Sequence, residues 1–122
     1  MKQKNNTSRP LKKVLIFLDN KYKIEIIYLL SLKKMRFGEI KESIEGITQQ
    51  LLTKQLREME KNKLINRKKF NGFPRRVQYS ITAFGETIRP LVYSMITWEK
   101  DNQRKINYLL KKKPLESIFD YY

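Results

Sequence analysis

Apolar residues recur at helical spacing along most of the chain and divide it into several short helices. Residues 11–18 are apolar almost all round, and residues 22–32 are rich in isoleucine and leucine. The isoleucines of 22–32 leave a strand interpretation open, although the length of the segment favours a helix. After a basic connector at 33–37, residues 38–45 predict a third helix, for which Gly38 is an acceptable N-cap. Its inner side is apolar and consists of Phe37, Ile40 and Ile44.

The clearest helix covers residues 48–62. Thr48 is a suitable N-cap, because its hydroxyl can accept from the free backbone N–H of Gln50 or Leu51. Apolar positions with a period of 3.6 residues predict one buried stripe, made of Leu52, Leu56 and Met59. Gly46 stands where a left-handed residue would end the preceding helix, and a short glycine turn between two amphipathic helices is typical of a helix-turn-helix.

The other face of the 48–62 helix is polar and basic. Its side chains include types that pair with adenine, guanine or the thymine methyl group in a major groove. They are Gln49, Gln50, Thr53, Lys54 and Arg57. We interpret this helix as a DNA-recognition helix, and the plainer alternative is a solvated amphipathic face.

Two β-prone segments, residues 64–70 and 75–81, follow this helix. The sequence Asn71-Gly72 between them predicts a hairpin, and Val77, Tyr79 and Ile81 alternate as in a half-buried strand. Five cations lie towards the hairpin tip with no acid among them: Arg67, Lys68, Lys69, Arg75 and Arg76. We expect this basic wing to cover residues 67–76 and to contact DNA, rather than to serve only as edge protection.

Both ends of the chain extend beyond these elements. Residues 1–10 are polar and predict a flexible basic arm, and Pro10 fits the first turn of the helix that follows it. A long helix capped by Thr82 is predicted after the hairpin, with a kink at Pro90. Residues 101–122 form a basic and aromatic extension.

The predicted fold is mainly α (α+β), a winged helix-turn-helix over residues 11–100 with a two-stranded wing hairpin and terminal dimerisation helices. The terminal helices carry more apolar surface than one small chain covers, which predicts a homodimer that also uses residues 101–122. The predicted dimer contacts are Leu11, Val14, Leu15, Leu18, Met95, Trp98, Ile106, Leu109 and Leu110.

Charge and composition restrict the classes of partner and of chemistry that are possible. The 122 residues carry a formal charge of +15, which indicates a polyanion such as nucleic acid or an anionic membrane surface. Cysteine and histidine are absent, so thiol chemistry and the usual general base are excluded. Three glutamates, Glu39, Glu42 and Glu45, are interpreted as a solvated face rather than a metal site. No enzyme activity, cofactor or membrane span is predicted, and a cytoplasmic location is expected.

An ordered set of short motifs resembles the HxlR-type winged-helix regulators over about residues 11–100. The motifs are Met35 to Ile40, Ile44 to Thr48, Leu52-Thr53, Leu56 to Glu60, Leu64-Ile65, Pro74 to Val77, Tyr79 to Thr82, Gly85, Pro90 and Trp98. The resemblance implies a homodimeric bacterial transcription factor that binds a duplex operator with two-fold character. It also implies that residues 48–57 form the recognition surface and that residues 68–76 form the wing.

The expected DNA contacts divide into two kinds. The amides near Thr48 and the cations of Arg36, Lys54, Lys69, Arg75 and Arg76 are expected to hold phosphates. Gln49, Gln50 and Arg57 are expected to approach base edges, and Lys68 belongs to the wing. An RNA- or ribosome-associated binding protein is the alternative. Several HxlR-type regulators sense oxidants through a cysteine near the N-terminus, which this chain lacks, so the inducing signal, like the operator, stays open.

Overall fold

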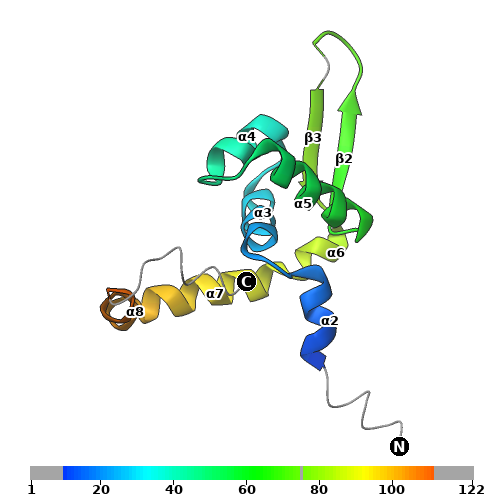
Figure 1. Cartoon of the computed structure of the whole chain (residues 1–122). Coiled ribbons are helices and arrows are strands. Elements are labelled where there is room, and N and C mark those ends of the chain that lie inside the picture. The colour runs from blue at the N-terminus through cyan, green and yellow to red at the C-terminus, as the bar shows by residue number, and fades with distance from the viewer. Residues whose placement is uncertain (1–9, 75, 112–122) are drawn as a thin grey trace, which may run out of the picture. The chain divides into compact units, whose positions relative to one another are not determined.

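The computed structural model describes residues 10–74 and 76–111; residues 1–9 of the predicted arm, Arg75 and residues 112–122 lie outside them. The chain divides into two units, which meet between Arg89 and Pro90. Its elements are α2 (Pro10–Phe17), α3 (Lys21–Leu32), β1 (Met35–Arg36), α4 (Phe37–Ser43), α5 (Gln49–Lys61), β2 (Ile65–Phe70), β3 (Arg76–Ile81), α6 (Ala83–Glu86), α7 (Arg89–Asp101) and α8 (Gln103–Leu110) (Figure 1). The predicted class, mostly helical with a small antiparallel sheet, is confirmed.

The two helices of the helix-turn-helix are α4 and α5. Thr48 caps α5 as predicted, since its hydroxyl oxygen accepts from the backbone N–H of Leu51 at 3.1 Å. Gly46 has a φ of +79°, the left-handed conformation predicted for the turn. Residues 21–32 form a helix rather than a strand, and Asn20 caps it by accepting from the amides of Tyr22 and Lys23.

The sheet has three strands in the order β1-β3-β2, all antiparallel. The β2–β3 hairpin was predicted, whereas β1 lies in the segment expected to be a connector. Met35 pairs with Tyr79 and is buried. Arg36 pairs with Gln78 and is also the N-cap of α4, where Gly38 had been expected. The N–H of Arg36 donates to Glu39 Oε1 at 2.8 Å, which stabilises the start of α4.

The core of the first unit lies between α3, α4, α5 and the sheet. Its fully buried apolar residues are Ile26, Ile27, Ile40, Ile44, Leu52, Leu56, Met59, Leu64 and Ile65. The predicted stripe of α5 is therefore confirmed. At Gly85 the backbone of α6 approaches Leu64 so closely that an added Cβ would overlap the Leu64 carbonyl oxygen. Thr82 caps α6 by accepting from the Gly85 N–H at 2.8 Å.

The prediction of one long kinked helix after Thr82 was wrong. Two helices, α6 and α7, are separated by a turn at residues 87–88. Pro90 lies in the first turn of α7 instead of at a kink. The first turn of a helix has no acceptor for its amide hydrogens, so proline is tolerated there, and the chain starts a new helix just before it.

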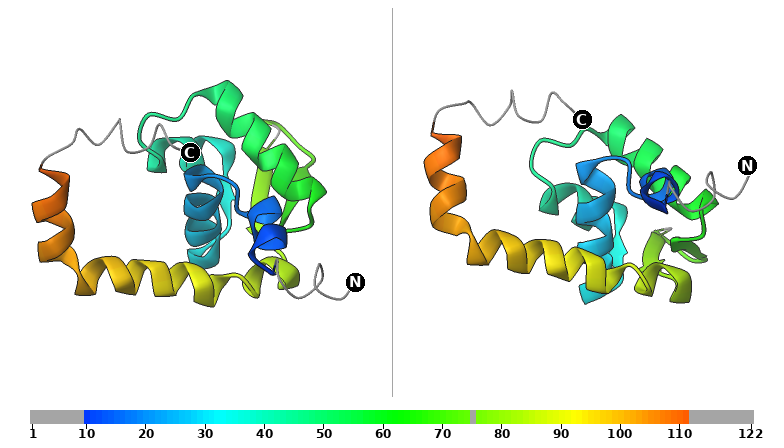
Figure 2. Two further views of the ribbon diagram at one scale, coloured as in Figure 1. Left: turned by 60° about the horizontal axis from the view of Figure 1, so that its bottom comes forward. Right: turned by 90° about the horizontal axis from the view of Figure 1, so that it is seen from below.

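The second unit contains α7 and α8. The chain turns at Asn102, whose side chain donates to the Trp98 carbonyl oxygen at 2.8 Å, and α8 then leaves the direction of α7 (Figure 2). Met95, Trp98 and Leu109 are exposed. None of the helices within residues 10–74 and 76–111 has the length and apolar character needed to cross a membrane.

Candidate nucleic-acid interface

The predicted recognition residues lie on the outer face of α5. Gln49, Gln50, Lys54 and Arg57 are exposed. Two threonines are partly committed to the helix itself, because Thr48 serves as the cap and the Thr53 hydroxyl donates to the Gln49 carbonyl oxygen at 2.8 Å. The methyl group of Thr53 therefore offers more to a partner than its hydroxyl does. Amides, a guanidinium and an ammonium remain directed to solvent along one side of the helix.

The inner side of α5 is tied to α3 by polar contacts that sequence reasoning missed. Lys23 of α3 is only 2% exposed, and its Nζ lies 2.6 Å from Glu58 Oε1 and 2.9 Å from Asp19 Oδ1. Gln55 of α5 is also buried and accepts from the Asn20 side-chain amide at 2.9 Å. These two links add polar contacts on the side of α5 that Leu52, Leu56 and Met59 already bury, and so support the orientation in which its other side faces outward.

Burial of Lys23 would by itself lower the pKa of its ammonium group. The hydrogen bonds to Glu58 and Asp19 and the charges of both carboxylates outweigh burial, so the pKa of Lys23 is raised. The residue is therefore held as a cation. A signal for it exists in the sequence, because Lys23 shares a helical face with Ile26, Ile27 and Leu30. Gln55 likewise lies within the Leu52 and Met59 stripe.

The wing presents cations on both of its strands. Lys68, Lys69 and Arg76 are exposed, whereas Arg67 Nε pairs with Glu60 of α5 at 3.4 Å. The Lys68 ammonium lies 5.1 Å from the centroid of the Phe70 ring. Arg75 was predicted as part of this group and lies outside the described residues. One wing arginine thus makes an exposed ion pair with α5, and the other described cations of the wing face solvent.

Two hollows in the surface are lined in part by residues predicted to contact DNA. Arg36 and Arg76 line a hollow of about 370 Å³ beside the wing loop, so the edge strand β1 adds its arginine to the wing. A smaller hollow of about 190 Å³ is lined by Thr53, Arg57, Arg67 and Tyr79, among others, at the junction of α5 and the wing base. Burial raises the pKa of Tyr79, against the opposing effect of the nearby Arg67. One hollow thus lies between α5 and the base of the wing, and the other lies between β1 and the wing loop.

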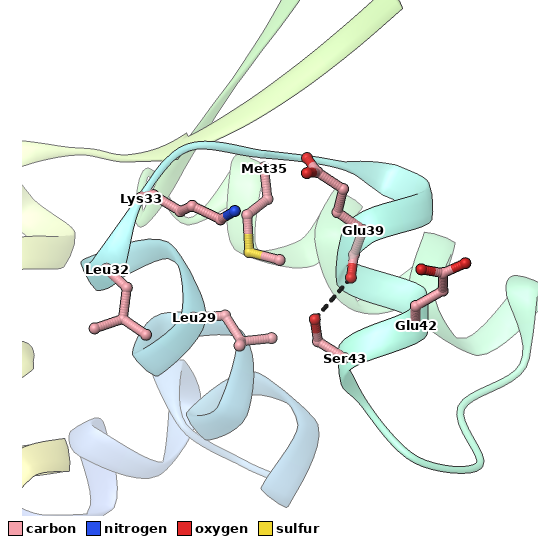
Figure 3. Close-up of a pocket in the computed structure, with 7 residues that line it drawn as sticks. All are labelled: Leu29, Leu32, Lys33, Met35, Glu39, Glu42 and Ser43. Atoms are coloured by element: carbon pink, nitrogen blue, oxygen red, sulfur yellow. Dashed lines mark hydrogen bonds between the residues drawn. The ribbon is translucent and has the colours of Figure 1, made fainter.

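The outer side of α4 differs from that of α5. A groove of about 540 Å³ runs between α3, β1 and α4, with apolar Leu29, Leu32 and Met35 on one side and Glu39 and Glu42 on the other (Figure 3). Glu39, Glu42 and Glu45 are all exposed. No group of three acidic, histidine or cysteine side chains in the described part of the chain is arranged to hold a metal ion.

The predicted dimer contacts divide by exposure. Leu11, Leu15 and Trp98 are largely exposed, with Trp98 at 62%. Val14, Met95 and Leu109 are exposed as well, and Ile106 and Leu110 are half-buried. Leu18 is only 8% exposed because it packs in the core, so little of its side chain remains for a partner.

Comparison with known proteins decides the family. The model of the HxlR-like helix-turn-helix family matches residues 17–107. The chain belongs to this family. HTH-type transcriptional regulators among its relatives include YdeP of Bacillus subtilis, 35% identical over 82% of this chain and 78% of YdeP. BH0655 of Halalkalibacterium halodurans is 36% identical over 84% of this chain and 91% of its own length. This HxlR-like protein is thus a DNA-binding transcriptional regulator of the helix-turn-helix type and not an enzyme.

Solved structures agree with the family. The reduced form of the redox regulator HypR superposes with a TM-score of 0.77 at 33% identity, covering 81% of this chain and 98% of that one. A MarR-family transcriptional regulator from Enterococcus faecalis gives a TM-score of 0.71 at 31% identity, with 84% and 93% covered. The winged-helix fold of this HxlR-like regulator is therefore shared with transcriptional regulators.

Proposed function

We propose that this HxlR-like regulator binds a duplex operator as a homodimer, with α5 in the major groove and the β2–β3 wing on the adjacent backbone and minor groove. The observation that carries the proposal is the outward direction of Gln50, Lys54 and Arg57 from a helix whose other side is core. Gln49, Gln50 and Arg57 are assigned to base edges. The amides at Thr48 and the cations Arg36, Lys54, Lys69, Arg75 and Arg76 are assigned to phosphates, which position the helix.

The homodimer is proposed because apolar side chains at both ends of the described chain lack cover. Leu11 and Leu15 of α2, Trp98 of α7 and Leu109 of α8 are each more than half exposed. A two-fold dimer would bury such surfaces and present two copies of α5, which predicts an operator with two-fold character. Sedimentation velocity tests this point, and Trp98→Glu should shift the protein towards a monomer. A wild-type monomer at micromolar concentration would contradict the dimer.

The inducing signal is not thiol oxidation. HypR is a redox regulator by its name, but this chain contains no cysteine. The RNA-binding alternative needs aromatic side chains stacked on an exposed sheet face. Tyr79 of the central strand is buried, which does not favour that alternative.

The test of DNA recognition is selection of duplexes from a random-sequence library, followed by titrations over a range of salt concentrations. A dimer that neutralises roughly 6 to 10 phosphates loses about 10³- to 10⁵-fold in affinity between 50 and 200 mM salt. Arg57→Ala should weaken binding to the selected duplex more than to bulk DNA. Arg76→Ala should weaken both and reduce the salt slope by about one unit. Failure to enrich any duplex, or capture of structured RNA in preference to duplex, would remove the proposal.

A further inference from the structure

The loop that joins β2 to β3 contains a phenylalanine with no cover. The exposed fraction of Phe73 is 101%, so no described residue shields its ring. Phe70, at the end of β2, differs because it is 38% exposed and lies beside the Lys68 ammonium. Burying a phenylalanine side chain against a partner is favourable, because it removes a large apolar surface from water. The ring of Phe73 therefore offers a large contact to any partner that reaches the loop.

The surroundings of Phe73 specify the charge of that partner. Lys68, Lys69 and Arg76 are exposed on the two strands, and no acidic residue occurs between Ile65 and Ile81. Arg36 of β1 adds another cation at the hollow that Phe73 helps to line. The partner must therefore be anionic and must also offer a surface against which an aromatic ring packs. DNA meets both requirements, since sugars and base edges lie between its phosphates.

The length of the wing matches the spacing of DNA grooves. Each strand has six residues, which at about 3.3 Å per residue spans roughly 20 Å. The hairpin projects away from α5, with its loop at the far end (Figure 1). Neighbouring major and minor grooves lie half a helical turn apart, and a turn is about 34 Å. With α5 in the major groove, the loop reaches the adjacent minor groove. A lipid surface could contact the exposed Phe73, but it would not require this distance between α5 and the loop.

We propose that Phe73 enters the minor groove beside the sequence contacted by α5 and partly unstacks one base step. This inference rests on the proposed function, because it assumes that α5 occupies the major groove. Apolar wedges of this kind kink the duplex, and pyrimidine–purine steps such as TA unstack most easily. Phe73 thereby makes affinity depend on flanking sequence that α5 does not touch.

The first test compares variants on one duplex, selected by the wild-type protein from a random-sequence library. Fluorescence anisotropy at several salt concentrations should show that Phe73→Ala binds about 5- to 30-fold more weakly, because a stacking contact is lost. The dependence of affinity on salt should be unchanged, because the substitution removes no charge. Phe73→Leu should stay within about 3-fold of wild type, since leucine also acts as a wedge. Arg76→Ala is the matched control and should lower the slope by about one unit. Thermal unfolding should be unaltered for Phe73→Ala, whose side chain is fully exposed.

The second test changes the DNA. Replacing a TA step in the footprinted flank by a stiff A-tract should weaken the wild-type protein and leave Phe73→Ala unaffected. Equal affinities of wild type and Phe73→Ala, or an equal flank effect on both, would overturn the inference while leaving the proposed function intact. Loss of binding to phosphatidylserine vesicles by Phe73→Ala, with duplex affinity retained, would assign the ring to a membrane instead. A wild-type protein that enriches no duplex would remove the proposed function itself.

Discussion

The two helices of the helix-turn-helix are both amphipathic but differ in the charge of their outer sides. Their inner sides contribute to one core. Around α4, three exposed glutamates (Glu39, Glu42 and Glu45) face solvent with Lys41. The exposed charges of α5 are instead positive, at Lys54, Arg57 and Lys61. The formal charge of +15 is therefore not spread evenly, and this distribution supports the proposal that α5, and not α4, faces the DNA.

The largest expected effect tests this difference with one identical change on each helix. Lys54→Glu on α5 should weaken DNA binding about 100-fold at constant salt, equivalent to about 2.7 kcal/mol, because a phosphate contact becomes a repulsion. Lys41→Glu on α4 should alter affinity less than about 3-fold, since α4 is not proposed to contact the backbone. Anisotropy titrations of both variants with the same duplex measure the ratio.

Both substitutions reverse the charge of an exposed lysine. Lys41 lies in the last turn of α4, where a basic side chain interacts favourably with the helix dipole, so Lys41→Glu should cost α4 some stability that Lys54→Glu does not cost α5. Melting curves check that both variants are folded at the temperature of the titrations. Equal losses of affinity for Lys41→Glu and Lys54→Glu would mean that the overall charge, rather than the outer side of α5, governs binding.

The inner sides of the two helices also differ. The buried side chain of α4 is that of the apolar Ile40, whereas α5 adds polar links through Gln55 and Glu58. We expect Glu58→Gln to lower the free energy of unfolding by about 1 to 3 kcal/mol, because it leaves the buried Lys23 with one carboxylate fewer. Glu60→Gln removes an exposed ion pair with Arg67 and should cost less than about 1 kcal/mol. Urea unfolding followed by circular dichroism measures both, and equal costs would contradict an anchoring role for Lys23.

Local signals made most of the fold predictable. Thr48 and Gly46 mark the ends of the turn through capping and left-handed preferences that act within a few residues. Asn71-Gly72 and the alternation of Val77, Tyr79 and Ile81 mark the hairpin in the same way. Of the site, the outward face of α5 followed from its periodicity.

The features missed from the sequence depend on distant parts of the chain. Strand β1 has two residues, too few for any periodicity, and exists because Met35 pairs with Tyr79. Lys23 and Glu58 are 35 positions apart, so their contact is set by how α3 packs on α5. The break before Pro90 was not predictable locally, because proline is compatible both with a kink inside a helix and with the first turn of a new helix. The burial of Leu18 depends on core residues that are distant in the sequence, so its neighbours in the chain do not show that it is covered.

The smallest expected effect concerns the pH dependence of stability that arises from the buried Lys23, which contacts Glu58 of α5. The pKa of Lys23 is raised in the folded protein, while an unfolded lysine titrates near about 10.4. Between these two values the folded state binds more protons, so stability is fully present below about pH 10.4 and is lost as the pH rises through the folded pKa. The stability difference between wild type and Lys23→Met should therefore shrink above pH 10. Burial also raises the pKa of Tyr79, which lowers stability at alkaline pH in both proteins and cancels in the difference. Urea titrations at pH 8 and 11 measure it, and a difference that stays constant would show that the ammonium charge of Lys23 does not hold α5 in place.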